Sequence, residues 1–151
     1  MRTLRGDLLE LALDGTFDVI VHGCNCQCQM GKGIALAIKQ RFPEAYVADC
    51  ATEKGSRQKL GGFSTAKIER GSRAFVIVNA YTQFHWRGAG VKADYEAIRS
   101  VMRGVASAFR ESRIGYPKIG AGLAGGDWSI ISAIIDEELA GLDHTYVEFS
   151  A

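Results

Sequence analysis

Short apolar runs alternate along this chain with segments whose apolar residues recur every three or four positions. Residues 18–23 are mainly apolar, as expected for a buried central strand. Residues 74–81 are dense in β-branched and aromatic side chains, which also favours a strand. The three- and four-residue spacing predicts a helix that begins near Lys92 and buries one face, formed by Tyr95, Ile98, Met102, Val105 and Phe109.

The remaining pattern continues this alternation. Further strands are predicted at residues 2–5, 63–69, 114–118 and 145–149, and further helices at 7–13, 33–41, 44–52 and 127–138. Strands that alternate with helices predict a three-layer α/β/α sandwich around a mixed, largely parallel sheet. The length of 151 residues suits one core, and no linker interrupts the chain, so we expect a single domain over 1–151.

Charge and hydropathy narrow the possible partners. The chain has 18 basic and 17 acidic residues and no run of like charges, which argues against a general nucleic-acid binder but leaves open a modified base or nucleic-acid end. No apolar stretch approaches the ~20 residues of a bilayer span, and the N-terminus lacks the apolar core of a signal peptide. We expect a cytoplasmic monomer without a membrane partner.

Three cysteines alternate at Cys24, Cys26 and Cys28, and Cys50 follows. This spacing matches neither the paired cysteines of a zinc knuckle nor a secreted disulfide framework, so we expect no metal and no cofactor. The thiols either pack at the end of a strand, or Cys26 and Cys28 are exposed in a loop and sensitive to oxidation.

Two glycine-bearing turns stand where a strand should pass into a helix, at residues 28–33 and 119–126. A helix N-terminus has unpaired N–H groups and partial positive charge, and glycine lets the backbone approach an anion closely. Each turn therefore predicts a phosphate site, and two together indicate a diphosphate.

The second turn also satisfies the dinucleotide fingerprint G-x-G-x-x-G through Gly120, Gly122 and Gly125. That fingerprint normally opens the first βαβ unit of a nucleotide-binding half, whereas only one helix and one strand follow here. The position favours a diphosphate loop without hydride transfer.

Three motifs, in order, resemble those of macro domains, which are ADP-ribose-binding modules. They are Gly6-Asp7-Leu8, the run from Val21 through Asn25 to Met30-Gly31-Lys32-Gly33-Ile34-Ala35, and Pro117-Lys118-Ile119-Gly120-Ala121-Gly122-Leu123. Within the family the chain is most similar to the branch of terminal ADP-ribose glycohydrolase, DNA-directed antitoxins and yeast-type ADP-ribose-1''-phosphate phosphatase.

The resemblance implies a role for individual residues. Asp7 would accept the adenine amine, Phe149 would pack on adenine, and Asn25 would face the distal ribose. Asp7 and Phe149 could instead be a helix cap and a core residue. The full implied ligand-binding set is Asp7, Leu8, Asn25, Met30, Gly31, Lys32, Gly33, Ile34, Ala35, Thr82, Gln83, Ile119, Gly120, Ala121, Gly122, Leu123, Ala124 and Phe149.

Catalysis is less well specified, because glycohydrolase relatives have a lysine at the position of Gln83 and an aspartate at that of Ala124. An amide can be neither a Schiff-base former nor a general base. The catalytic candidates are His22, Asn25 and His85, although a histidine at a strand end is often structural. The favoured hypothesis is a protein that binds ADP-ribose and hydrolyses a derivative of it, either ADP-ribose-1''-phosphate or an ADP-ribosylated macromolecule. The alternatives are a binding module that does not turn ADP-ribose over, and a different nucleotide-binding enzyme on the same sandwich.

Overall fold

The computed structural model describes residues 1–88 and 90–150, which form a six-stranded sheet in the order β1-β6-β5-β2-β4-β3. The strands are β1 (Arg2–Gly6), β2 (Val19–Cys24), β3 (Phe63–Arg70), β4 (Arg73–Tyr81), β5 (Ile114–Tyr116) and β6 (His144–Phe149). Neighbouring strands pair in parallel except for the antiparallel pair of β3 and β4. The predicted mixed, largely parallel sheet is therefore confirmed.

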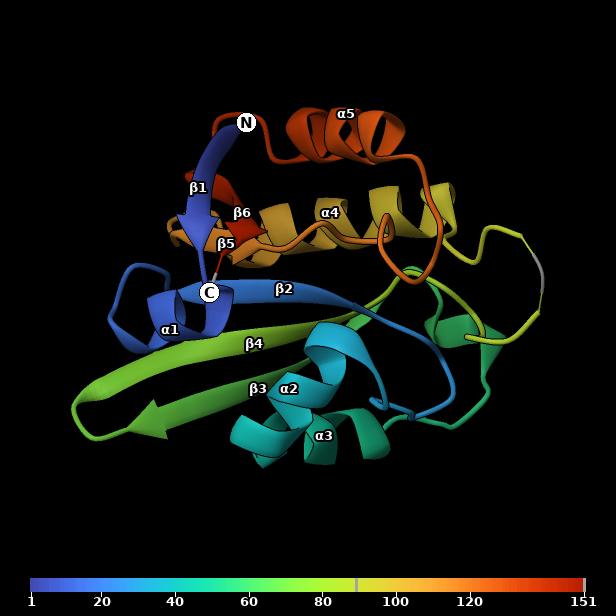
Figure 1. The fold of residues 1–151 in the computed structure, drawn as a ribbon, viewed down its shortest axis with the longest axis horizontal. Coiled ribbons are helices and arrows are strands. Elements are labelled where there is room, and N and C mark those ends of the chain that lie inside the picture. The colour runs from blue at the N-terminus through green and yellow to red at the C-terminus, as the bar shows by residue number, and fades with distance from the viewer. Residues whose placement is uncertain (89, 151) are drawn as a thin grey trace.

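Helices cover both faces of this sheet. They are α1 (Leu8–Leu13), α2 (Gly33–Arg41), α3 (Pro43–Cys50), α4 (Tyr95–Ala108) and α5 (Trp128–Glu138), with a 3-10 turn, η1, at Arg57–Lys59. Figure 1 shows α4 and α5 on one side of the strands and α1, α2 and α3 on the other. The three layers agree with the predicted α/β/α sandwich.

The alternation of side chains along β2 builds a separate core on each face. Val19 and Val21 pack with the apolar residues of α4 and α5, whereas Ile20 packs with those of α1, α2 and α3. Successive side chains of a strand point to opposite faces, so a strand buried on both faces has a continuous apolar run. This explains the apolar pattern of residues 18–23.

Element boundaries differ from the prediction where a cap or a proline intervenes. Helix α4 begins at Tyr95 rather than near Lys92, because the carboxylate of Asp94 accepts a hydrogen bond from the N–H of Ala97 at 3.0 Å. Strand β5 ends at Tyr116, directly before Pro117, although the strand was predicted through residue 118. Proline cannot donate a ladder hydrogen bond, which favours the earlier end.

The parallel strands end at one edge of the sheet, so the segments that follow β1, β2, β4, β5 and β6 gather there. Open α/β sheets bind ligands at this edge. Within residues 1–88 and 90–150, no helix has both the length and the apolar character that crossing a membrane requires.

Candidate functional site

A cleft of about 1200 Å³ lies along the carboxyl edge of the sheet. Its walls come from the segments after β1, β2, β4 and β5 and from the end of β6. The lining residues are Gly6, Asp7, Leu8, Leu9, Gly23, Cys24, Asn25, Gln29, Gly31, Lys32, Gly33, Ile34, Ala35, Ala37, Arg41, Thr82, Gln83, Trp86, Pro117, Lys118, Ile119, Gly120, Gly122, Leu123, Ala124, Tyr146, Val147, Glu148 and Phe149. Most residues of the predicted ligand-binding set thus share one cleft.

The N-terminus of α2 opens into this cleft without a side-chain cap. Lys32, at the N-cap position, makes no capping hydrogen bond, and the first turn holds no acidic residue. By contrast, aspartate side chains cap α1, α4 and α5. An uncapped helix start carries partial positive charge and N–H donors, which suit an anion. Gly33 begins the helix at φ +59°, a conformation that glycine adopts without strain.

The turn between β5 and α5 forms the opposite wall. The N–H of Gly126 donates to the carbonyl of Gly120 at 2.7 Å, and the N–H of Gly125 donates to that of Gly122 at 3.1 Å. A β-carbon at Gly122 would meet no atom within 4 Å, whereas one at Gly33 would lie 3.5 Å from Leu123 Cδ1. The two predicted phosphate turns therefore face each other closely across the cleft.

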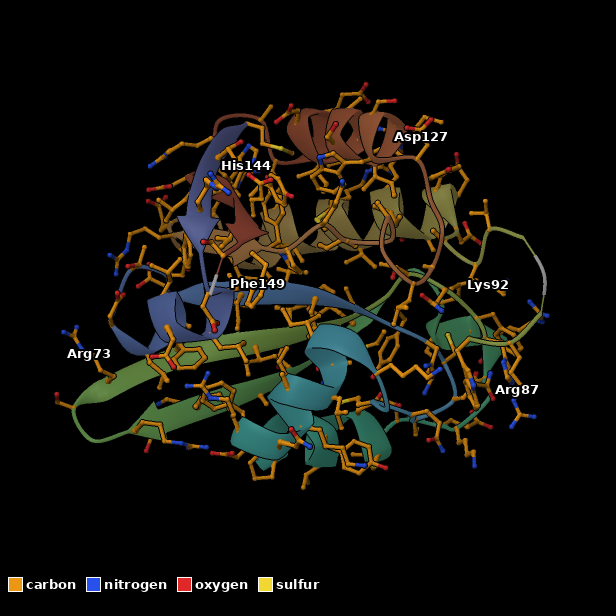
Figure 2. All side chains as sticks on the ribbon, viewed as in Figure 1. Arg73, Arg87, Lys92, Asp127, His144 and Phe149 are labelled. Atoms are coloured by element: carbon orange, nitrogen blue, oxygen red, sulfur yellow. The ribbon has the colours of Figure 1, made fainter. Side chains whose placement is uncertain are left out.

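Asp7 and Phe149 mark the end of the cleft beside β1 and β6. One carboxylate oxygen of Asp7 accepts the N–H groups of Leu9 at 2.9 Å and Glu10 at 3.3 Å, so Asp7 caps α1 and lines the cleft at the same time. Phe149 is 74% exposed. Figure 2 shows it beside β6, well away from Arg87 on the segment that follows β4. The alternative of Phe149 as a core residue is excluded.

Asn25 is half-buried and fastens the loop after β2. Its Nδ2 donates to the carbonyl of Gln29 at 3.0 Å, and its Oδ1 accepts from the N–H of Gln27 at 2.9 Å. Both ends of the amide therefore hold the turn that leads to α2. This loop-shaping role was not predicted from the sequence.

Thr82, Gln83 and Trp86 form the end of the cleft beside β4. Thr82 is 1% exposed, and its hydroxyl has no hydrogen-bond partner among the described residues. Gln83 Nε2 donates to the carbonyl of His85 at 3.1 Å, and Trp86 is 41% exposed. This end offers uncharged hydrogen-bonding groups and an aromatic face.

A family model for the macro domain matches residues 21–135, which include most of β2, both turns and most of α5. The chain belongs to the macro domain family. An uncharacterized 17.5 kDa protein of Enterobacteria phage T4 is 34% identical over 156 residues, covering 99% of this chain and 96% of that protein. A DNA ADP-ribosyl glycohydrolase of Thermus aquaticus is 32% identical over 151 residues, covering 95% of this chain but only 39% of that enzyme.

Solved structures agree with the family assignment. The macrodomain of Mycobacterium tuberculosis DarG superposes with a TM-score of 0.78 at 25% identity, covering 100% of this chain and 98% of that one. The macrodomain of Thermus aquaticus DarG superposes at 0.74 with 27% identity, over 99% and 97% of the two chains. A shorter sequence match, 46% identical over 43 residues and covering 28% of this chain, is to the ADP-ribose 1''-phosphate phosphatase of Aspergillus fumigatus.

The macro-domain structure places His22 outside the cleft lining. Its ring is 1% exposed, and its Nε2 donates to Asn79 Oδ1 at 2.7 Å. Burial lowers the pKa of His22 to about 4. The buried imidazole reaches the cleft only through Cys24, whose Sγ lies 3.6 Å from Nε2, and burial favours its neutral form. The sequence left two alternatives for His22, a catalytic role and a structural role at the end of a strand. Its position agrees with the structural role.

His22 begins a chain of buried hydrogen bonds. Asn79 Nδ2 donates to Ser64 Oγ at 3.1 Å, Ser64 Oγ lies 2.8 Å from the Tyr81 hydroxyl, and that hydroxyl donates to Asp49 Oδ1 at 2.8 Å. The chain joins β2, β4, β3 and α3. At its far end, Asp49 Oδ2 is buried and has no hydrogen-bond partner among the described residues.

His85 lies beside the cleft but not in its lining. Its ring stacks on Trp86 with centroids 4.2 Å apart, and its Nδ1 accepts from the N–H of Arg87 at 3.0 Å. The guanidinium of Arg87 lies 5.2 Å from the Trp86 ring centre. Trp86 itself lines the cleft.

Two other predicted ligand residues point elsewhere. Met30 is buried among the apolar residues of α1, α2 and α3. Ala121 packs against the core beneath α4 and α5, and its N–H donates to Lys118 O at 3.4 Å. Their side chains pack against the two hydrophobic cores and do not line the cleft.

The cysteines of the C-x-C-x-C run are buried, which corrects the alternative that Cys26 and Cys28 are exposed. Cys26 is fully buried, and Cys28 has its Sγ 3.4 Å from the carbonyl of Asp49. Burial raises the pKa values of Cys24 and Cys26. Among the described residues, no group of three or more His, Cys, Asp or Glu could hold a metal ion.

Sequence reasoning missed several cleft residues, among them Arg41, Pro117, Tyr146, Val147 and Glu148. Tyr146 and Glu148 belong to β6, whose C-terminal end lies at the carboxyl edge of the sheet. The position of that strand between β1 and β5 is a property of the topology, which periodicity does not report.

Proposed function

We propose that this macro domain binds ADP-ribose in the carboxyl-edge cleft. The observation that carries the proposal is the pair of turns that face each other, the uncapped start of α2 and the glycine turn after β5. Two anion cradles in contact suit two linked phosphates better than one. The macro-domain family and the names of its ADP-ribosyl relatives support the same ligand.

The order of the strands gives the ligand a direction. The cleft passes from Asp7 and Phe149 at β1 and β6, across the two turns at β5 and β2, to Thr82 at β4. Neighbouring strands are separated by ~4.8 Å, so this edge spans about 19 Å. In the proposed pose, adenine lies at Asp7 and Phe149, the diphosphate between the turns, and the second ribose beside Thr82.

The adenine end provides base selection. The carboxylate of Asp7 accepts the exocyclic amine of adenine, which guanine replaces with a carbonyl oxygen. Phe149 gives an exposed ring against which the base can pack. Lys32 and the N–H groups after it supply positive potential for the diphosphate.

A thermal-shift panel tests this assignment. A ligand that binds only the native state raises the melting temperature, by an amount equivalent to about 2.7 kcal/mol at a hundredfold excess over Kd. We expect ADP-ribose to raise the melting temperature, ADP to raise it less, and GDP to leave it unchanged. No response to ADP-ribose would contradict the proposal.

Hydrolysis of an ADP-ribose derivative is the second candidate function. The observation that favours it is the similarity, over 95% of this chain, to a DNA ADP-ribosyl glycohydrolase, although this chain spans 39% of that enzyme. Against it, the cleft residues near β4 are Thr82, Gln83 and Trp86, none of which ionises near neutral pH. Any turnover would then use a water molecule aligned by these groups.

Substrates of two kinds distinguish the two candidates. The protein is incubated with a single-stranded DNA oligonucleotide that carries ADP-ribose on a base, and separately with ADP-ribose 1''-phosphate. Release of ADP-ribose or of inorganic phosphate, lost in Gly122→Glu, would establish a hydrolase. Binding of ADP-ribose with neither product released would establish a binding module.

A further inference from the structure

The side chains of Cys28 and Lys59 meet beside the C-terminal end of α3. Lys59 Nζ lies 3.6 Å from Cys28 Sγ and donates to Thr52 Oγ1 at 2.7 Å. The same sulfur lies 3.4 Å from the carbonyl oxygen of Asp49. The thiol and the amine are therefore held side by side by neighbouring protein groups. Neither Cys28 nor Lys59 lines the carboxyl-edge cleft, so the proposed ligand site gives this contact no role.

The contact joins two segments that are distant in the chain. Cys28 belongs to the loop between β2 and α2, and Lys59 ends η1, 31 residues later. Cys28 has a φ of 56°, which is uncommon for a residue other than glycine. Its carbonyl accepts from the Tyr46 hydroxyl at 3.4 Å, so both its backbone and its side chain are tied to the part of the chain that follows α2.

Cys28 differs from the other two cysteines of the C-x-C-x-C run in its access to a small molecule. Cys26 is fully buried and Cys24 is 4% exposed, and burial raises the pKa of both thiols. Cys28 is 8% exposed and touches the half-buried Lys59, a pair that an oxidant as small as hydrogen peroxide can reach. The thiolate is the form of cysteine that attacks a peroxide, and a neighbouring cation stabilises it.

A buried carboxylate near the pair can take up a proton. Asp49 is 1% exposed; its Oδ1 accepts from the Tyr81 hydroxyl at 2.8 Å, and its Oδ2 has no hydrogen-bond partner among the described residues. Burial raises the pKa of Asp49, and the nearby charge of Lys59 partly offsets this effect. Asp49 is therefore a suitable acceptor for a proton that Lys59 gives up.

We propose that Cys28 and Lys59 are an oxidative modification site, where hydrogen peroxide joins the two side chains through a sulfur–nitrogen bond. In the first step the O–O bond of the peroxide breaks, one oxygen bonds to the sulfur as a sulfenic acid, and the other leaves as water. In the second step the nitrogen of Lys59 displaces the sulfenic oxygen as a second water molecule and bonds to sulfur. The sulfur loses two electrons to the peroxide. Of the two protons that the ammonium loses, one leaves with the second water and one passes to Asp49.

The new bond would fasten the loop after β2 to η1 without entering the cleft. A covalent link between positions far apart in the chain stabilises the native state, chiefly by restricting the unfolded chain. We therefore expect the oxidised protein to melt at a higher temperature than the reduced protein.

The test treats wild type, Cys28→Ser and Lys59→Arg with hydrogen peroxide, followed by digestion without reductant and mass spectrometry. In wild type we expect a peptide pair joined between residues 28 and 59, about 2 Da lighter than the sum of its two peptides and separated by dithiothreitol. Arginine keeps the positive charge beside the sulfur but lacks the amine. Lys59→Arg should therefore accumulate sulfenic acid at Cys28, which dimedone traps, and Cys28→Ser should yield no joined pair.

Melting temperatures give an independent readout. Peroxide should raise that of wild type by about 5 °C or more, reversibly with dithiothreitol, and should not raise that of Lys59→Arg. Cys50→Ser, which removes the exposed cysteine, should respond as wild type does. A disulfide from Cys28 to another cysteine, an unmodified Cys28, or an equal gain in Lys59→Arg would overturn the proposal. Since none of these readouts uses a nucleotide, the outcome is independent of whether the cleft binds ADP-ribose.

Discussion

His22 donates its Nε2–H to Asn79 Oδ1 at 2.7 Å, and burial of the ring lowers the pKa of His22 although this hydrogen bond alone would raise it. Asn79 can only accept at that atom, because its Nδ2 donates to Ala45 O at 2.9 Å and to Ser64 Oγ. The proton on Nε2 leaves Nδ1 as an acceptor, and the thiol of Cys24 lies 3.8 Å from it. His22 is a structural link between β2 and β4.

The depressed pKa of His22 predicts acid sensitivity. The unfolded chain binds a proton near the ordinary histidine pKa of about 6.5, whereas the folded chain binds it only near pH 4. Below pH 6.5 the unfolded state therefore binds more protons, and the stability contribution is lost as pH falls toward 4. The linked change is about 3 kcal/mol.

Urea unfolding of wild type and His22→Gln at pH 7.5, 5.5 and 4.5 measures this effect. Glutamine keeps an amide donor but does not titrate in this range. The stability difference between wild type and variant should shrink as the pH falls. A difference independent of pH would mean that His22 titrates normally in the folded protein.

Asp7 and Asp94 form a matched pair for testing the adenine site. Both cap a helix, but only Asp7 lines the cleft. Asparagine caps about as well as aspartate, so neither Asp7→Asn nor Asp94→Asn should lower the melting temperature greatly. A charged acceptor forms a stronger hydrogen bond than a neutral one, so Asp7→Asn alone should weaken ADP-ribose binding, by about fivefold. Equal affinities in the two variants would contradict the adenine assignment.

The glycines of the second turn differ in how much space surrounds them. A β-carbon at Gly126 would lie 2.6 Å from the carbonyl oxygen of Gly120 and 2.8 Å from Ile131 Cδ1, whereas Gly122 faces open space. Gly126→Ala should therefore lower the free energy of unfolding by about 1–3 kcal/mol. Gly122→Ala should change it by less than about 0.5 kcal/mol. Urea unfolding of both variants measures the contrast, and similar values would show that the turn is less tightly closed.

Tryptophan fluorescence offers a direct signal of occupancy. Of the two tryptophans, Trp86 lines the cleft, while Trp128 packs on Tyr146 with ring centres 4.9 Å apart. Ligand binding should change the emission of wild type and of Trp128→Phe more than that of Trp86→Phe, because Trp128 reaches the cleft only through Tyr146. An equal signal in Trp86→Phe and wild type would show that the ligand does not approach Trp86.

The sequence pattern was sufficient to predict the α/β/α sandwich, because strands and helices differ in the spacing of their apolar residues. The apolar run at residues 18–23 and the spacing along α4 depend on local burial, which the sequence records directly. Both glycine turns could likewise be located, because a positive φ at Gly33 and Gly120 leaves a residue-type signature.

The chemistry around His22, Asn25 and Thr82 could not be predicted in the same way. His22 and Asn25 have side chains that could face a ligand, and only three-dimensional contacts reveal that both hold protein groups. The resemblance implied Thr82 as a ligand residue, but only the structure shows that its hydroxyl is buried and has no hydrogen-bond partner among the described residues. The role of such a side chain depends on its hydrogen-bond partners, and these can lie far away in the sequence.

Calorimetric titration with ADP-ribose, comparing wild type with Gly122→Glu, tests the central claim most directly. The glutamate finds open space in the free protein, so the variant should fold, but its carboxylate would stand in the diphosphate turn. Gln40→Glu, an exposed residue of α2 outside the cleft lining, is the charge-matched control. We predict saturable binding by wild type and Gln40→Glu and its loss in Gly122→Glu. Absence of binding in wild type, or equal binding by all three proteins, would contradict the account.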